Sequence, residues 1–192
     1  MHSVGDRAPA FRLPGVTDSA ASTFDLERTT GDGTAVVLLF YPFDFSPVCT
    51  SELCALRDGD FFELTEGVEA WAISGDSVYA HWAFSDQYGF SFPLLADSDG
   101  SVARAYDVCY DELEGHRNVP KRAVIVVDEN RHVQYRWVTD EAYESPSFEP
   151  VLKAVRALPG VDADDFDEFG LSGKPKSPVD GPLSPDEEGQ DE

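Results

Sequence analysis

The chain has 192 residues, of which 42% are hydrophobic, and this is enough for one globular domain with a sizeable core. It carries 37 acidic and 14 basic residues, so its formal net charge is −23, and such a surface repels the phosphates of nucleic acids. No apolar run reaches the about 18 residues that a membrane span needs, and the first 15 residues lack a basic stretch followed by an apolar segment, so we expect a cytoplasmic protein without a membrane partner.

Apolar runs of strand length alternate with helical patterns along the chain. The expected strands are Ala35–Phe40, Val68–Ser74, Ala123–Val127 and Val133–Val138, and the expected helices are Pro47–Glu66, Val78–Tyr88, Ser101–Tyr106 and Phe148–Leu158. The first and third strands are nearly all apolar, as in strands that are buried on both faces. Asp128–Asn130 has the length of a hairpin turn. The pattern predicts an α/β fold with a central mixed β-sheet flanked by helices.

The first expected strand leads into a loop and then into a helix start that contains a cysteine. Ser46 is a favoured N-cap residue, and Pro47 occupies the first helical position, where proline is tolerated. Cys49 then lies in the first turn, where free backbone N–H groups and the helix dipole favour a reactive thiolate. A buried, inert cysteine is the alternative, and this local geometry does not decide between the two.

The order of residues around Cys49 resembles the active-site motif of the peroxiredoxin family. Pro42, Ser46 and Cys49 spell Pro-x-x-x-Ser/Thr-x-x-Cys. The opening Gly5–Pro14 and the segment Phe92–Asp97 also resemble segments of this family, and the resemblance extends from Gly5 to Leu158. It implies a thioredoxin-like fold and a thiol peroxidase that needs no metal and no organic cofactor.

The resemblance also assigns roles to individual residues. It implies that Cys49 attacks the peroxide and that Pro42 shields this cysteine from water. The hydroxyl of Ser46 and the backbone N–H of Cys49 would donate to the peroxide oxygens. Arg122 would hold the thiolate and stabilise charge on the breaking O–O bond. Glu52 matches a position that braces the arginine in the family. The alternatives are a surface cation for Arg122 and a solvated helix charge for Glu52.

Three cysteines, Cys49, Cys54 and Cys109, are too few for a disulfide scaffold, so we expect a reduced chain in which any disulfide is transient. Cys54 follows Cys49 by five positions, a spacing that resembles the bacterioferritin comigratory protein or peroxiredoxin Q subfamily. The resemblance implies that Cys54 resolves the Cys49 sulfenic acid as a disulfide, which a thioredoxin-like protein or a small thiol then reduces. We expect Cys109 to be a packed or half-exposed free thiol, with a back-up resolving role as the alternative.

Helix geometry sets a condition on this disulfide. Residues five apart in a helix are roughly 8.6 Å apart between Cα atoms, whereas a disulfide usually needs about 4.4 to 6.8 Å. The helix between Cys49 and Cys54 must therefore unwind locally before the two sulfurs can join.

Other functions remain open at this point. A thioredoxin-like thiol–disulfide oxidoreductase normally uses Cys-x-x-Cys, and here four residues separate Cys49 from Cys54. A one-cysteine peroxidase with an external thiol and an inactive binding module are further alternatives. The four histidines show no metal-ligand spacing. The sequence does not distinguish a monomer from a homodimer.

The last 33 residues, 160–192, contain 11 acidic and two basic side chains together with four prolines. Such a segment buries too little apolar surface to offset its ordering entropy, so we expect a mostly disordered tail. Residues 1–159 would then form the peroxiredoxin domain. The net charge of −23 implies strong self-repulsion unless salt screens it, so we expect a protein from a high-salt, halophilic cytoplasm. An ordinary acidic protein with a disordered tail is the alternative.

Overall fold

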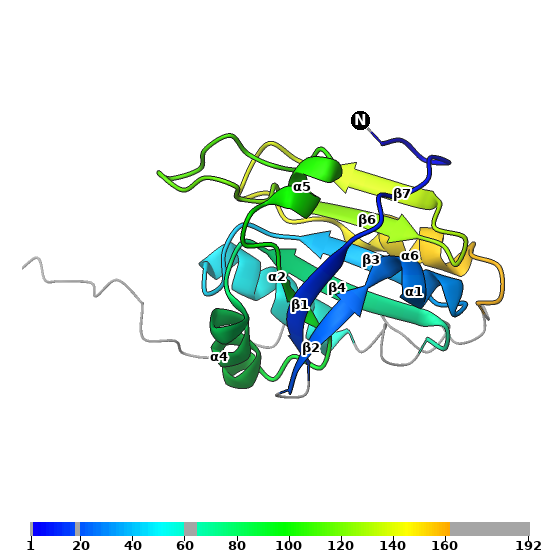
Figure 1. The fold of residues 1–192 in the computed structure, drawn as a ribbon, viewed down its shortest axis with the longest axis horizontal. Coiled ribbons are helices and arrows are strands. Elements are labelled where there is room, and N and C mark those ends of the chain that lie inside the picture. The colour runs from blue at the N-terminus through cyan, green and yellow to red at the C-terminus, as the bar shows by residue number, and fades with distance from the viewer. Residues whose placement is uncertain (1, 18–19, 60–64, 162–192) are drawn as a thin grey trace, which may run out of the picture.

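The computed structural model describes residues 2–17, 20–59 and 65–161 (Figure 1). Seven strands form one sheet in the order β2-β1-β5-β4-β3-β6-β7. The strands are β1 (Arg12–Thr17), β2 (Ala20–Asp25), β3 (Ala35–Phe40), β4 (Val68–Ser74), β5 (Leu94–Ala96), β6 (Ala123–Val127) and β7 (Val133–Val138). The helices are α1 (Leu26–Gly31), α2 (Pro47–Asp58), α4 (Val78–Tyr88), α5 (Ser101–Ala105) and α6 (Phe148–Arg156).

The sheet is mixed, as the sequence predicts. β3 runs parallel to β4 on one side and antiparallel to β6 on the other. β6 and β7 form an antiparallel hairpin across the expected turn, and Asp128 and Arg131 close this turn through backbone hydrogen bonds. The four expected strands have the bounds that the sequence indicates.

The helix that carries Cys49 is shorter than expected. α2 ends at Asp58 with Gly59 as its C-cap, and Glu66, the expected end, lies in a turn before β4. Residues 60–64 of the expected helix lie outside the described residues. α5 and α6 also end one and two residues before the predicted ends, at Ala105 and Arg156. Three strands, β1, β2 and β5, and the short helix α1 are additions to the predicted elements.

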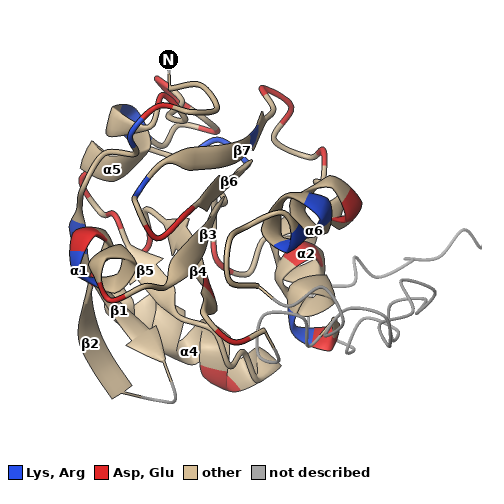
Figure 2. Cartoon of the chain, turned by 90° about the vertical axis from the view of Figure 1, so that its right-hand side faces the viewer, with Lys and Arg blue, Asp and Glu red and all other residues tan. Residues whose placement is uncertain are grey.

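Helices cover both faces of the sheet, and β3 contributes side chains to each. Val37 and Leu39 pack with α2, α4 and α6 in one hydrophobic cluster, while Val36 and Leu38 pack with α1 and α5 in another. Figure 2 shows α2 and α6 on one side of the sheet and α1 and α5 on the other. β3 is buried along its whole length, which agrees with its unbroken apolar sequence.

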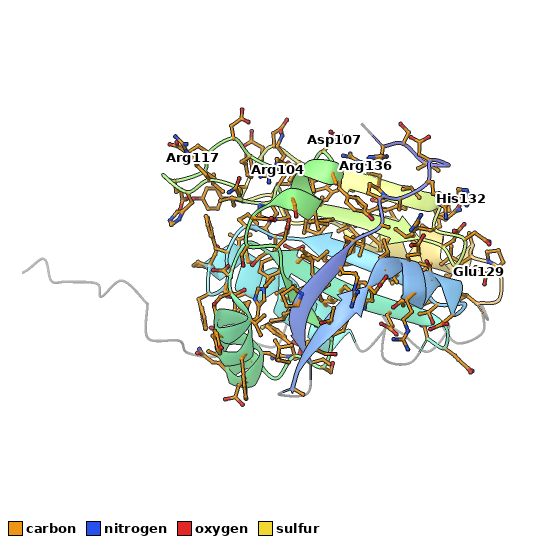
Figure 3. All side chains as sticks on the ribbon, viewed as in Figure 1. Arg104, Asp107, Arg117, Glu129, His132 and Arg136 are labelled. Atoms are coloured by element: carbon orange, nitrogen blue, oxygen red, sulfur yellow. The ribbon has the colours of Figure 1, made fainter. Side chains whose placement is uncertain are left out.

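The pairing of β3 with β6 brings two distant segments to one end of the sheet. Phe40, the last residue of β3, pairs with Ala123, the first residue of β6. Tyr41 and Arg122 therefore emerge from the sheet next to each other. Figure 3 shows Arg117, in the loop before β6, at one end of the molecule and Glu129, at the β6–β7 turn, at the other. The loop between β3 and α2, residues 41–46, lies at the Arg117 end and is called the cysteine loop below.

Part of the predicted domain organisation lies outside the described residues. The structure describes the chain as far as residue 161, so the acidic tail 160–192 and its expected disorder stay predictions. Within the described ranges, no helix is both long and apolar enough to cross a membrane.

Candidate active site

The loop after β3 delivers Cys49 to the first turn of α2. Ser46 is the N-cap residue, with an extended backbone (φ −60°, ψ 134°), and Pro47 occupies the start of the helix. The backbone N–H of Thr50 donates to the carbonyl of Ser46 at 2.8 Å, which closes the first helical turn. The hydroxyl of Ser46 makes no capping hydrogen bond, so it is free to donate to a ligand. Cys49 is completely buried.

Arg122 contacts this cysteine from the start of β6. Its Nη2 donates to Cys49 Sγ at 3.3 Å and to the backbone carbonyl of Ala142 at 2.8 Å. Its Nη1 donates to Glu52 Oε2 in an ion pair. The Arg122 side chain is 1% exposed, so one buried guanidinium connects the sulfur, a carboxylate and a backbone carbonyl.

Burial and the neighbouring charges act in opposite directions on the pKa values of Glu52 and Arg122. Burial raises the pKa of Glu52 to about 7, and the attraction of Arg122 only partly counteracts it. For Arg122, burial acts to lower the pKa, but the neighbouring Glu52 and Cys49 outweigh burial and raise it. Within the described part of the chain, Glu52 Oε1 has no hydrogen-bond partner, which adds to the cost of charging this carboxyl. Arg122 therefore stays positive beside the sulfur, while Glu52 titrates near neutral pH.

Arg122 thus contacts both Cys49 and Glu52, although it lies 73 positions after the cysteine. Pro42 is buried in the same loop, and Ser46 is half-buried. The surface positions considered as alternatives for Arg122 and Glu52 are wrong, because both side chains are almost fully buried.

The other two cysteines lie apart from this contact, and all three are free thiols. Cys54 is half-buried in the second half of α2, where it packs against the hydrophobic cluster beneath that helix. Burial raises the pKa of both the Cys54 and the Cys109 thiol. Cys109 donates to the carbonyl of Tyr110 at 3.4 Å and is also half-buried, as expected for a packed free thiol.

Four residues of this region were not singled out from the sequence. Tyr41, Asp44 and His81 form a buried polar cluster under the cysteine loop, and Ala142 supplies its carbonyl to Arg122. Asp44 could have been noticed in the sequence, because it is an acidic residue between Pro42 and Cys49. A backbone carbonyl gives no signal in a sequence, so Ala142 could not have been found. Among the described residues, no group of three or more potential ligands could hold a metal ion.

Comparisons with known proteins show the family to which the chain is similar. The model of the AhpC/TSA family matches residues 4–136. Peroxiredoxin bcp of Coxiella burnetii is 35% identical over 136 residues, which cover 70% of this chain and 87% of that protein. Chloroplastic peroxiredoxin Q of Triticum aestivum is 37% identical over 69% of this chain, and the match spans 58% of the wheat protein.

Solved structures show the same architecture. Reduced 2-Cys peroxiredoxin of Plasmodium vivax has a TM-score of 0.70 at 31% sequence identity, and the match covers 80% of this chain and 94% of the Plasmodium chain. Peroxidoxin BcpB of Mycobacterium tuberculosis has a TM-score of 0.69 at 29% sequence identity, and the match covers 82% of this chain and 98% of the Mycobacterium chain. The expected thioredoxin-like fold is confirmed by this likeness. The chain therefore belongs to the AhpC/TSA family and is an enzyme of the peroxiredoxin type.

Proposed function

We propose that this enzyme reduces hydrogen peroxide and organic hydroperoxides by a two-cysteine cycle in which Cys49 attacks the peroxide. The observation that carries the proposal is the hydrogen bond from Arg122 Nη2 to Cys49 Sγ at 3.3 Å in a buried site. A fixed positive charge beside the sulfur stabilises the thiolate, which is the nucleophilic form. The same guanidinium can stabilise negative charge that develops on the departing oxygen.

The chemical step can be written with these groups. The Cys49 thiolate attacks one peroxide oxygen, an S–O bond forms and the O–O bond breaks. The departing oxygen takes up a proton and leaves as water or an alcohol, and Cys49 becomes a sulfenic acid. The Ser46 hydroxyl and the Cys49 backbone N–H, at the start of α2, are the donors that would orient the peroxide. Pro42 would limit water access, and Glu52 would hold Arg122 through their ion pair.

Recovery of the thiol is assigned to Cys54. Its thiol condenses with the sulfenic acid, which releases water and forms a Cys49–Cys54 disulfide. Both residues lie in α2, which is continuous from Pro47 to Asp58, so this step requires local unwinding of the helix. A thioredoxin-like protein or a small thiol would then reduce the disulfide.

Variants of the three cysteines test the cycle. We expect peroxide consumption with a thioredoxin system to be lost in both Cys49→Ser and Cys54→Ser and to persist in the matched control Cys109→Ser. One equivalent of peroxide should produce a Cys49–Cys54 link in a non-reducing peptide mass spectrum. Full turnover of Cys54→Ser would indicate a one-cysteine peroxidase with an external thiol. Disulfide exchange without peroxide consumption by the intact protein would indicate a thiol–disulfide oxidoreductase instead.

The cellular setting is part of the proposal. We place the enzyme in a cytoplasm of high salt because its formal net charge is −23. A monomer and a homodimer both fit the proposed cycle. Figure 2 shows basic positions interspersed with acidic ones, an arrangement that gives no support to nucleic acid as a partner.

A further inference from the structure

Three buried side chains beneath the cysteine loop form a hydrogen-bonded cluster that the proposed cycle does not use. The Tyr41 hydroxyl donates to Asp44 Oδ1 at 2.7 Å, and His81 Nδ1 lies 2.8 Å from Asp44 Oδ2. His81 Nε2 lies 3.1 Å from the carbonyl oxygen of Leu95. The side chains of His81 and Asp44 are 0% and 2% exposed, so the cluster is sealed from solvent.

The hydrogen-bond pattern fits an ion pair between Asp44 and His81. Both ring nitrogens of His81 face oxygen acceptors, and the doubly protonated imidazolium is the form that donates to both. In that form the imidazolium would offset the charge of the buried Asp44 carboxylate. Burial, and next the charge of Asp44, raise the pKa of Tyr41, so its hydroxyl keeps its proton and donates to Asp44.

This cluster fastens the cysteine loop to two neighbouring elements. His81 belongs to α4, and the Leu95 carbonyl belongs to β5. The backbone N–H of Asp44 also donates to Asp76 Oδ2 at 2.9 Å, in the turn after β4. Asp44 therefore fixes the loop through its main chain as well as its side chain.

These contacts of Asp44 hold the next residue, Phe45, in a strained backbone conformation beside Ser46. Phe45 follows Asp44 and has φ 60°, a left-handed conformation that is unfavourable for an aromatic residue. Its ring packs on Phe84 of α4, with the ring centroids 4.8 Å apart. Such a conformation persists only where the surroundings enforce it. Ser46 comes directly after Phe45, so the conformation of Phe45 determines where the Ser46 hydroxyl lies.

We propose that Asp44 and His81 are positioning residues that hold residues 42–46 in the conformation that receives the peroxide. This inference rests on the proposed peroxidase function. The pair acts on the placement of the Ser46 donor and the start of α2. It does not supply the charge that stabilises the Cys49 thiolate, because Arg122 supplies that charge from another element.

Two reagents separate these roles in the full-length protein. Hydrogen peroxide needs both the thiolate and the positioned donors, whereas iodoacetamide needs only an accessible thiolate. In Asp44→Asn and His81→Asn, we expect the rate of Cys49 oxidation by hydrogen peroxide to fall by about tenfold or more. The rate of Cys49 alkylation should not fall, because Arg122 still stabilises the thiolate, and circular dichroism should show a native fold. The control variant Asp86→Asn removes an exposed charge from α4, the helix that contains His81, and should leave both rates unchanged.

Each other result overturns the inference in a recognisable way. An unchanged peroxide rate means that the pair does not position the loop. An equal fall in both rates means loss of the thiolate rather than loss of positioning. If Asp44→Asn does not fold, the same criteria are applied to His81→Asn. Slow oxidation of Cys49 in the intact protein would contradict the peroxidase proposal itself, which separates that failure from a failure of the positioning role.

Discussion

At the scale of single residues, Glu52 is the group whose burial has a measurable consequence. Its folded-state pKa of about 7 lies above the ordinary value of 4.5, because burial outweighs the attraction of Arg122. The folded protein therefore binds more protons at this site than the unfolded chain between these two pH values. The stability from this group is fully present below about pH 4.5 and is lost as pH rises through about 7.

We predict that Glu52→Gln removes this pH dependence. Relative to the variant, the parent protein should lose about 2 kcal/mol of unfolding free energy between pH 5.5 and pH 8, since the lower limit lies about 1.5 units below the folded pKa and one unit corresponds to about 1.36 kcal/mol. Urea unfolding of both proteins at several pH values gives the difference. Glu149→Gln, on the exposed surface of α6, is the matched control and should follow the parent protein. Parallel stability curves for the parent and Glu52→Gln would contradict the raised pKa.

The candidate site was predictable where its residues follow a local pattern. Ser46, Pro47 and Cys49 lie within four positions of one another, so a helix start with a cysteine in its first turn could be recognised from the sequence. Arg122 was identified only through family resemblance, because a contact across 73 positions depends on how β3 pairs with β6. The contact of Asp44 with His81 spans 37 positions and joins two elements whose packing no local pattern reveals.

At the scale of secondary structure, the central strands were predictable and the outer ones were not. β3 and β6 are unbroken apolar runs, since both of their faces are covered by helices. β1 contains Pro14 and Gly15, two residues that disfavour a strand, and it forms because β2 and β5 pair with it on either side. The end of α2 was misjudged because Gly59, a poor helix former, was counted as part of the helix, whereas it is the C-cap.

The integrity of α2 should set the rate of disulfide formation but not the rate of peroxide attack. Ala55 is an exposed position of α2 beyond both cysteines, and Ala55→Gly weakens the helix by about 1 kcal/mol. Because unwinding precedes disulfide formation, we predict that this variant forms the Cys49–Cys54 disulfide up to about fivefold faster. Stopped-flow fluorescence after a single addition of peroxide separates the oxidation and disulfide phases.

A matched substitution in another helix controls for overall loss of stability. Ala83 is exposed in α4, and Ala83→Gly carries the same helix penalty outside the segment that must unwind. It should leave the disulfide phase unchanged. Equal acceleration in both variants would mean that global opening, rather than local unwinding of α2, limits the step.

At the scale of the whole molecule, charge opposes the compact state. The chain has 37 acidic residues against 14 basic ones, and several ion pairs of the described part are largely exposed, such as Arg28 with Asp32 and Arg117 with Glu112. Exposed pairs of this kind contribute little to stability, typically about 0 to 1 kcal/mol each. They do not offset a net charge of −23, so we expect ions in solution to relieve part of the repulsion.

We predict that the melting temperature of the protein rises as the KCl concentration is increased from 0.1 M to 2 M. The Debye length falls from about 10 Å at 0.1 M to about 3 Å at 1 M, so salt screens repulsion between like charges on the folded surface. Differential scanning calorimetry in KCl, with sorbitol at matched osmolarity as the control, separates screening from osmotic effects. Most of the rise should occur below about 1 M, where screening changes most. Equal melting temperatures at 0.1 M and 2 M KCl would show that repulsion does not limit stability and would remove the physical basis for placing the protein in a high-salt cytoplasm.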